Sequence, residues 1–155
     1  MEIELTEQDI INTMQWTVDT ILIPHFMELG LDATGEWRNS LNVRAEGSTG
    51  IINGRKYTEQ LVWGRRPGAM PPIQPLITWA QAKLGLSGNE AKSAAFAIAK
   101  KIANEGTNIY KEGGTDLLEV LQAPENIKRI TEYLQAQYTP RVTAYLERQI
   151  KEAFA

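Results

Sequence analysis

Cysteine is absent from this chain of 155 residues, so it has neither a disulfide framework nor a thiolate metal site. Histidine is nearly absent too, since His25 is the only one. It follows Pro24 in an apolar stretch, and Glu28 comes three residues later, so we interpret His25 as a helix-face residue rather than as a general base. No acidic loop has EF-hand spacing, and no serine lies in a G-x-S-x-G elbow. We therefore expect a non-enzymatic protein with no cofactor and no metal.

An excess of positive charge and long apolar runs are also missing. The 16 basic residues are outnumbered by 19 acidic ones, which gives a net charge of -3. This balance argues against a main role in neutralising nucleic-acid phosphates, although a local basic patch stays open. No apolar run approaches the ~20 residues that span a bilayer. The first residues, MEIELTEQDI, are acidic where a signal peptide is basic and then apolar, so we expect a soluble protein without a membrane partner, assembled in a cytoplasm.

What is present is the composition of a globular protein, with 43% apolar and 23% charged residues. After Thr6, a candidate N-cap, apolar residues recur at spacings of three and four. This pattern predicts an amphipathic helix that packs across a sheet. Pro24 is expected to interrupt or restart the helix, and Gly30 to end it.

The middle of the chain predicts a small antiparallel meander. Apolar and polar residues alternate in SLNVRAEG, and we predict strands near 41–46, 50–53 and 56–63. Asn53 and Gly54 are a strong signal for a hairpin turn, because both residue types tolerate positive φ. The glycines of GSTG leave a long loop open as an alternative for that segment.

Two helices are predicted next. The first covers 73–84 and ends at Gly85. Ser87 and Glu90 predict a capping box at the start of the second helix, which Gly106 ends. Alanines dominate one face of this second helix, so another helix or a sheet can approach it closely.

The C-terminal part is helical in composition from 125 to 154, and Pro140 is the expected division between two helices. The fold class that follows is α+β: a long N-terminal helix packed on a small antiparallel sheet, then several helices including a C-terminal extension. We predict an α+β domain over 1–113 and a helical extension over 114–155 that packs on it.

A loop rich in proline and arginine, WGRRPGAMPP, lies directly before the helix at 73–84. It lacks the G-x-x-x-x-G-K-S/T and G-x-G-x-x-G patterns of phosphate-binding loops. Prolines reduce the entropy of the free loop, so a partner meets it already shaped. We interpret the loop as a docking element, and its candidate interface residues are Trp63, Gly64, Arg65, Arg66, Pro67, Gly68, Met70, Pro71 and Pro72.

Four cations are candidates for a positive patch at one end of the predicted hairpin: Arg55, Lys56, Arg65 and Arg66. Such a patch can contact phosphates and face DNA. The alternatives are an ordinary charged loop, or arginines that pair with carboxylates of a neighbouring subunit.

The four tryptophans fall into two pairs. Trp16 and Trp79 lie in predicted helices, where packing in the core or at its edge is the expected role. Trp37 and Trp63 lie at the ends of predicted elements, near arginines, and aromatic residues in such places are enriched at protein–protein interfaces.

The order of these segments resembles the minor tail proteins of tailed bacteriophages, also called tail-component, tail-completion or neck proteins. After a long N-terminal helix come TGEWRNSLNV, then YTEQLVWGRRPGAMPP, then ITWAQAKLGL and AAFAIAKKIANEGTNIYKEG. In that family a W-G-R-x-P-G-x-M-P-P segment leads into a W…K-G helix and then an A-x-x-I-A-x-x-I-x-x-x-G helix. The resemblance covers about residues 34–113, and the helical part from Thr115 onward departs from the short family members.

The resemblance implies a structural virion protein in the neck or tail region, part of a head–tail connector or tail-completion ring. Its implied partners are further copies of itself, portal or adaptor proteins and tail proteins, with packaged DNA close by. Two rival hypotheses stay open. One is a nucleic-acid-binding module that uses the four cations, and the other is an enzyme built on His25.

Overall fold

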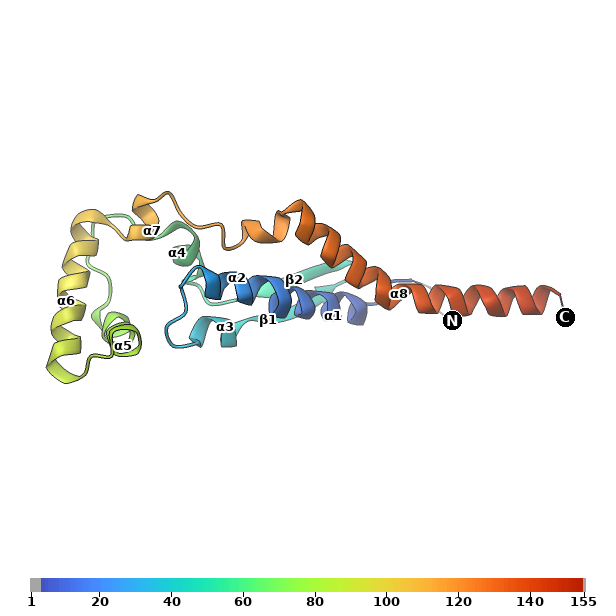
Figure 1. Cartoon of the computed structure of the whole chain (residues 1–155), viewed down its shortest axis with the longest axis horizontal. Helices are drawn as coiled ribbons and strands as arrows, with labels where there is room; N and C mark the ends of the chain where they lie inside the picture. Colours follow the sequence, from blue (N-terminus) through green and yellow to red (C-terminus); the bar gives the residue numbers. More distant parts are fainter. Residues whose placement is uncertain (1–3, 155) are drawn as a thin grey trace. The chain divides into compact units, whose positions relative to one another are not determined.

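The computed structural model describes residues 4–154 and has the expected α+β fold, mostly helical with one two-stranded antiparallel sheet (Figure 1). The chain forms two compact units. Unit 1 combines the segment up to His25, the segment Leu41–Asn53 and the segment from Glu119 onward. Unit 2 combines Phe26–Ser40 with Gly54–Leu118. The division at residue 113 stays a prediction, since it concerns which parts fold alone.

The N-terminal helix begins as expected at Thr6 and continues past Pro24. In α1 (Glu7–Thr17), Thr6 and Asp9 form a capping box in which each side chain accepts a hydrogen bond from the backbone N–H of the other residue. A π-helical turn, η1 (Val18–Leu22), then leads into α2 (Ile23–Glu28). Pro24 has no N–H to donate, so the preceding turn widens and the helix is not broken there.

The sheet of unit 1 is a hairpin of β1 (Asn42–Glu46) and β2 (Thr49–Asn53), in register from Asn42↔Asn53 to Glu46↔Thr49. The turn is therefore Gly47-Ser48, with φ of 60° at Gly47, which is the pattern of a type II′ turn. The expected hairpin turn at Asn53-Gly54 is wrong, because Asn53 already pairs with the first residue of β1.

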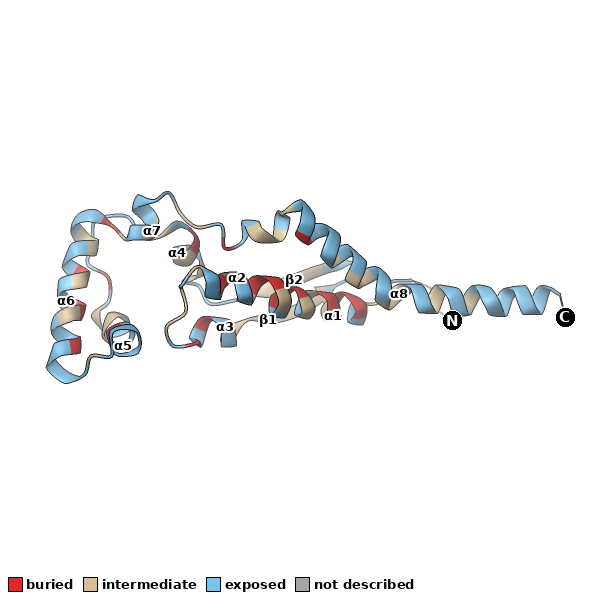
Figure 2. Cartoon of the chain, viewed as in Figure 1, coloured by how far each residue is buried: buried red, intermediate tan, exposed pale blue. Residues whose placement is uncertain are grey.

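Helix α1 packs on this hairpin, as the periodicity predicts, and Figure 1 shows the two running alongside each other. A glycine in β2 permits the close approach. A Cβ on Gly50 would lie 2.5 Å from Cγ of Met14 and 3.1 Å from Cγ2 of Ile10. Figure 2 shows buried residues recurring along α1.

The third predicted strand, 56–63, is wrong, since this segment forms the helix α4 (Thr58–Trp63). As a strand, neither of its faces would be free of polar residues. As a helix, it gathers its less exposed residues on one side, at spacings of one and four. These residues are Tyr57, Thr58, Leu61 and Val62. Burial of that side outweighs the local preference of valine, tryptophan and threonine for strands.

Trp37 is buried in α3 (Glu36–Ser40), which contradicts its interpretation as an interface residue. Its ring centroid lies 4.4 Å from that of Phe26, and its Nε1–H donates to Oγ1 of Thr58 at 2.8 Å. Trp37 is thus a core residue of unit 2 that holds α3 against the start of α4.

Helices α5 (Ile73–Leu84) and α6 (Gly88–Glu105) form a pair through their smallest side chains. Ala80 of α5 and three alanines of α6, at spacings of four, are fully buried: Ala91, Ala95 and Ala99. Small residues let the two backbones approach, and Figure 1 shows the helices crossing steeply. Gly85 ends α5 with φ of 64°, as predicted.

The predicted capping box at the start of α6 is wrong. Ser87 is the N-cap residue, but its side chain makes no capping hydrogen bond. Gly88 follows it with φ of 53°, and this left-handed conformation turns the chain away from the geometry in which Ser87 faces the N–H of Glu90.

The C-terminal segment after the 3₁₀ turn η2 (Glu119–Gln122) is one helix, α8 (Pro124–Ala153), and not two. Pro140 lies inside it. A proline removes one backbone hydrogen bond and bends a helix without having to end it, and α8 changes direction along its length in Figure 1.

Contacts with α1 hold the middle of α8. The rings of Trp16 and Tyr133 stack with centroids 4.7 Å apart, and Nε2 of Gln137 donates to Oγ1 of Thr13 at 2.9 Å. Trp16 therefore packs between helices, as predicted, whereas Trp79, for which the same role was expected, is 38% exposed on α5.

A salt bridge completes the contact between α1 and α8. Nη1 of Arg141 donates to Oδ1 of Asp9 at 2.9 Å, and Nη2 of Arg141 contacts Oδ2. The hydrogen bond from Arg141 and, to a smaller extent, the bonds from Thr6 lower the pKa of Asp9 to about 2, against the opposing effect of burial.

Candidate docking cleft

The WGRRPGAMPP loop leaves the end of α4 at Gly64, which lies directly on α7 (Asn108–Lys111). Gly64 has φ of 76°, and a Cβ there would lie 2.3 Å from the backbone nitrogen of Tyr110 and 2.6 Å from Oγ1 of Thr107. Only glycine fits this position, on both conformational and steric grounds.

Three hydrogen bonds fix the backbone of the loop to the end of α6 and the start of α7. Arg65 and Thr107 exchange two of them, since the N–H of Arg65 donates to Oγ1 of Thr107 at 2.9 Å and the N–H of Thr107 donates to the carbonyl of Arg65 at 2.9 Å. The N–H of Gly68 donates to the carbonyl of Ala103 at 2.9 Å. The path of the loop is therefore set by the protein itself and needs no partner.

Most side chains of this loop remain exposed. Trp63 is 59% exposed and Met70 48% exposed, which is high for large apolar residues. Pro71 differs, because it is buried and anchors the loop where α5 begins. Of the nine candidate interface residues, Pro71 is thus an anchor, while Gly64 and Arg65 are half-buried and the other six are exposed.

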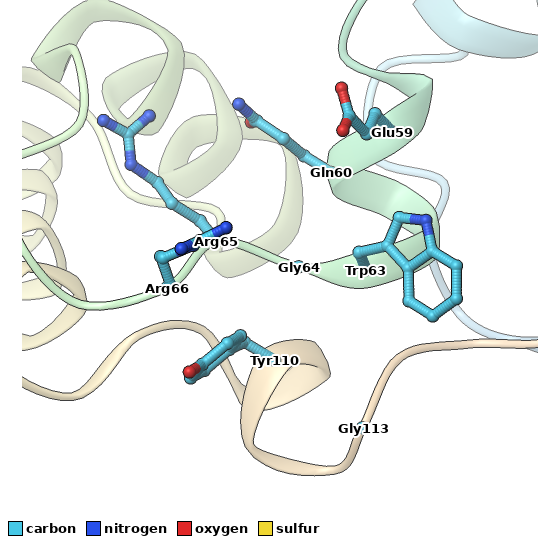
Figure 3. A pocket seen from close by; sticks show the side chains of 8 residues that line it. All are labelled: Glu59, Gln60, Trp63, Gly64, Arg65, Arg66, Tyr110 and Gly113. Carbon is cyan, nitrogen blue, oxygen red and sulfur yellow. The ribbon is translucent and has the colours of Figure 1, made fainter.

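A cleft of about 590 Å³ opens beside the first half of the loop (Figure 3). It lies wholly within unit 2, and its lining residues come from α4, the loop and the region of α7. They are Glu59, Gln60, Trp63, Gly64, Arg65, Arg66, Tyr110 and Gly113. In Figure 3 the two arginines lie on one side of Gly64 and Trp63 on the other, with Tyr110 below Arg66. The cleft thus combines a cationic side with an aromatic side.

The chain matches no family model, no curated protein and no solved structure.

The charge of the cleft is positive. Arg65 and Arg66 lie in it beside one carboxylate, Glu59. Within residues 4–154, the salt bridges involve neither of these two arginines. Two guanidinium groups are therefore available to carboxylates or phosphates of a partner.

The other two candidate cations do not join this site. Arg55 and Lys56 precede α4, whereas Arg65 and Arg66 follow it, and a helix of six residues separates the pairs by about 9 Å of axial rise. Nη2 of Arg55 also lies 3.4 Å from Oε1 of Glu36. The structure therefore brings Arg65 and Arg66 together but does not form one patch of four cations.

Burial and the nearby carboxylate of Glu36 raise the pKa of Tyr57, next to Arg55. Tyr57 precedes α4, whereas Arg65 and Arg66 follow this helix. Because the pKa of Tyr57 is raised, its phenol stays protonated near neutral pH.

His25 lies half-buried in α2. In the part of the chain from residue 4 to residue 154, no three His, Asp or Glu side chains are grouped so that they could hold a metal ion. In the same part, no helix is both long and apolar enough to cross a membrane.

The sequence identified the cleft residues of the WGRRPGAMPP loop and missed the others, which α4 and the region of α7 contribute. The arginines and Trp63 are apparent in the motif, but Tyr110 and Gly113 lie in an ordinary polar stretch after α6. One indirect signal could have predicted a new helix there, because Gly106 ends a helix and Thr107 directly after it is a candidate N-cap. In the structure, Oγ1 of Thr107 accepts a hydrogen bond from the N–H of Tyr110.

Proposed function

We propose that this chain is a structural protein of a tailed-bacteriophage virion and a subunit of the neck or head–tail connector ring that joins portal and tail. The order of motifs over residues 34–113 supports this function. The observation that carries it is the loop: its backbone is fixed by Arg65, Thr107 and Gly68, yet Trp63 and Met70 are exposed.

A fixed loop with exposed apolar side chains suits docking for a physical reason. Binding costs free energy when loops and side chains become ordered, and a loop already held in place avoids part of that cost. Tryptophan and arginine are also the residue types that most often dominate binding energy at interfaces. In a ring, Arg65 and Arg66 pair with a neighbouring subunit or face a DNA-filled channel, and the protein acts by assembly rather than by catalysis.

The test is a charge reversal in the loop. The double variant Arg65→Glu, Arg66→Glu keeps the backbone hydrogen bonds of the loop, so the purified protein should stay folded. It should fail to enter particles when it replaces the natural protein during phage assembly. Normal incorporation would rule out the loop as an electrostatic docking site.

The matched control reverses two charges away from the cleft. Lys100 and Lys101 are adjacent and exposed on α6, so Lys100→Glu, Lys101→Glu changes the net charge equally. This control should be incorporated normally. Quantitative mass spectrometry of purified particles then gives the copy number relative to portal, and absence of the unmodified protein from particles would refute the proposed function.

The second candidate function is nucleic-acid binding, favoured by the exposed rings of Trp63 and Tyr110 beside two arginines. Affinity for nucleic acid falls linearly with salt on a log–log scale, with a slope that reports the number of phosphates contacted, whereas docking to protein subunits requires no such binding to DNA. Binding to DNA at several salt concentrations therefore distinguishes the two functions.

A further inference from the structure

Two of the residues that line the cleft, Gly64 and Gly113, have no side chain. A Cβ on Gly113 would meet nothing within 4 Å, whereas the corresponding space at Gly64 is filled by α7. A partner can therefore bring its main chain close to the lining of the cleft at Gly113. An extended chain sends alternate side chains to opposite sides, which suits a cleft whose two sides differ in chemistry.

The sides of the cleft determine which side chains such a partner needs. Arg65 and Arg66 lie on one side and Trp63 on the other (Figure 3). An extended segment between them meets the guanidinium groups with carboxylates and the indole with an apolar residue. Tyr110, 44% exposed, adds a second ring at the cationic side.

Charge distinguishes this partner from nucleic acid. Glu59 also lines the cleft, and the cations Arg55 and Lys56 lie beyond the opposite end of α4. A nucleic-acid strand carries a phosphate on every nucleotide and would bring one toward Glu59. A peptide can place carboxylates only where the arginines are.

We propose that this cleft binds an extended acidic segment of a partner protein, in which acidic and apolar residues alternate. The proposal rests on the proposed docking function of the loop and names the chemistry of its partner. It places the carboxylates against Arg65 and Arg66 and an apolar side chain against Trp63.

The test is isothermal titration calorimetry of the full chain with the peptide acetyl-Glu-Leu-Glu-Leu-Glu-amide. The neutral peptide acetyl-Gln-Leu-Gln-Leu-Gln-amide and a short oligothymidylate are the comparison probes. The variant Arg65→Gln, Arg66→Gln should weaken binding of the acidic peptide about fivefold to tenfold, as expected for two solvent-exposed charge pairs. Trp63→Ala should weaken it as well, while circular dichroism shows that both variants are folded.

The matched control is Arg55→Gln, Lys56→Gln, which removes the same charge at the other end of α4 and should leave the affinity unchanged. Equal binding of the acidic and neutral peptides, or tighter binding of the oligothymidylate, would overturn the proposal. The proposed function fails separately, through absence of the chain from particles. If the loop variants fail to enter particles but no acidic peptide binds, the docking function stands and the acidic partner does not.

Discussion

Removing the salt bridge between Asp9 and Arg141 should loosen the contact between α1 and α8. Asp9 is only 5% exposed, and it serves both the capping box of α1 and the salt bridge. The change from its ordinary pKa of 3.8 to about 2 corresponds to about 2.5 kcal/mol by direct conversion. Because the side chain of Arg141 is 35% exposed, solvent screening reduces this to about 1–2 kcal/mol.

A double-mutant cycle with Asp9→Asn and Arg141→Met measures this coupling. Asparagine keeps an oxygen that can accept from the N–H of Thr6, so the cap is largely retained, while methionine keeps the apolar stem of the arginine. Urea denaturation at neutral pH, followed by tryptophan fluorescence, gives the free energy of unfolding of all four proteins. We expect a coupling free energy of about 1–2 kcal/mol.

The pH dependence has a definite sign. The folded pKa of Asp9 is below its unfolded value, so its contribution is fully present above about pH 4 and is lost as pH falls toward 2. The unmodified protein should lose stability over this range by about 1–2 kcal/mol more than Asp9→Asn does. A coupling free energy below about 0.3 kcal/mol, or identical acid sensitivity in the two proteins, would refute the reasoning.

Three substitutions test the backbone arguments. Gly64→Ala should destabilise the protein by more than about 2 kcal/mol, because the new Cβ meets α7, while Gly85→Ala, at a similar φ in open space, should cost only about 1 kcal/mol in the same denaturation assay. Pro140→Ala should restore a backbone hydrogen bond in α8 and raise the free energy of unfolding by about 1–3 kcal/mol. A loss of stability in thermal denaturation would instead show that the bend in α8 is needed for its contacts with α1.

Elements whose signals are local were predictable from the sequence. The bounds of α5 follow from the two prolines before it and Gly85 after it, and the hairpin strands follow from alternation within a few residues. The segment of α4 was predicted wrongly because its residues favour strands locally, and its helix depends on the burial of one side against α3 and α7. The residues of α3 and α7 that bury this side are distant from α4 in the sequence, so a local pattern does not reveal them.

The candidate site was half predictable for the same reason. Composition alone marks the loop as stiff and cationic. Its backbone conformation depends on Thr107, 42 residues after Arg65, and no spacing rule connects the two. Likewise, nothing local predicts that Arg55 and Arg65 lie beyond opposite ends of one short helix.

The way the two units are assembled from the chain has a consequence for synthesis on the ribosome. Unit 1 needs the segment from Glu119 onward, and Arg141, which forms the salt bridge with Asp9 of α1, is synthesised 132 residues after Asp9. Most of unit 2 is one continuous stretch, Gly54–Leu118, so it can fold while later residues are still being added. Until α8 has been synthesised, the face of α1 that it covers stays open, so α1 depends on a helix that the ribosome makes much later.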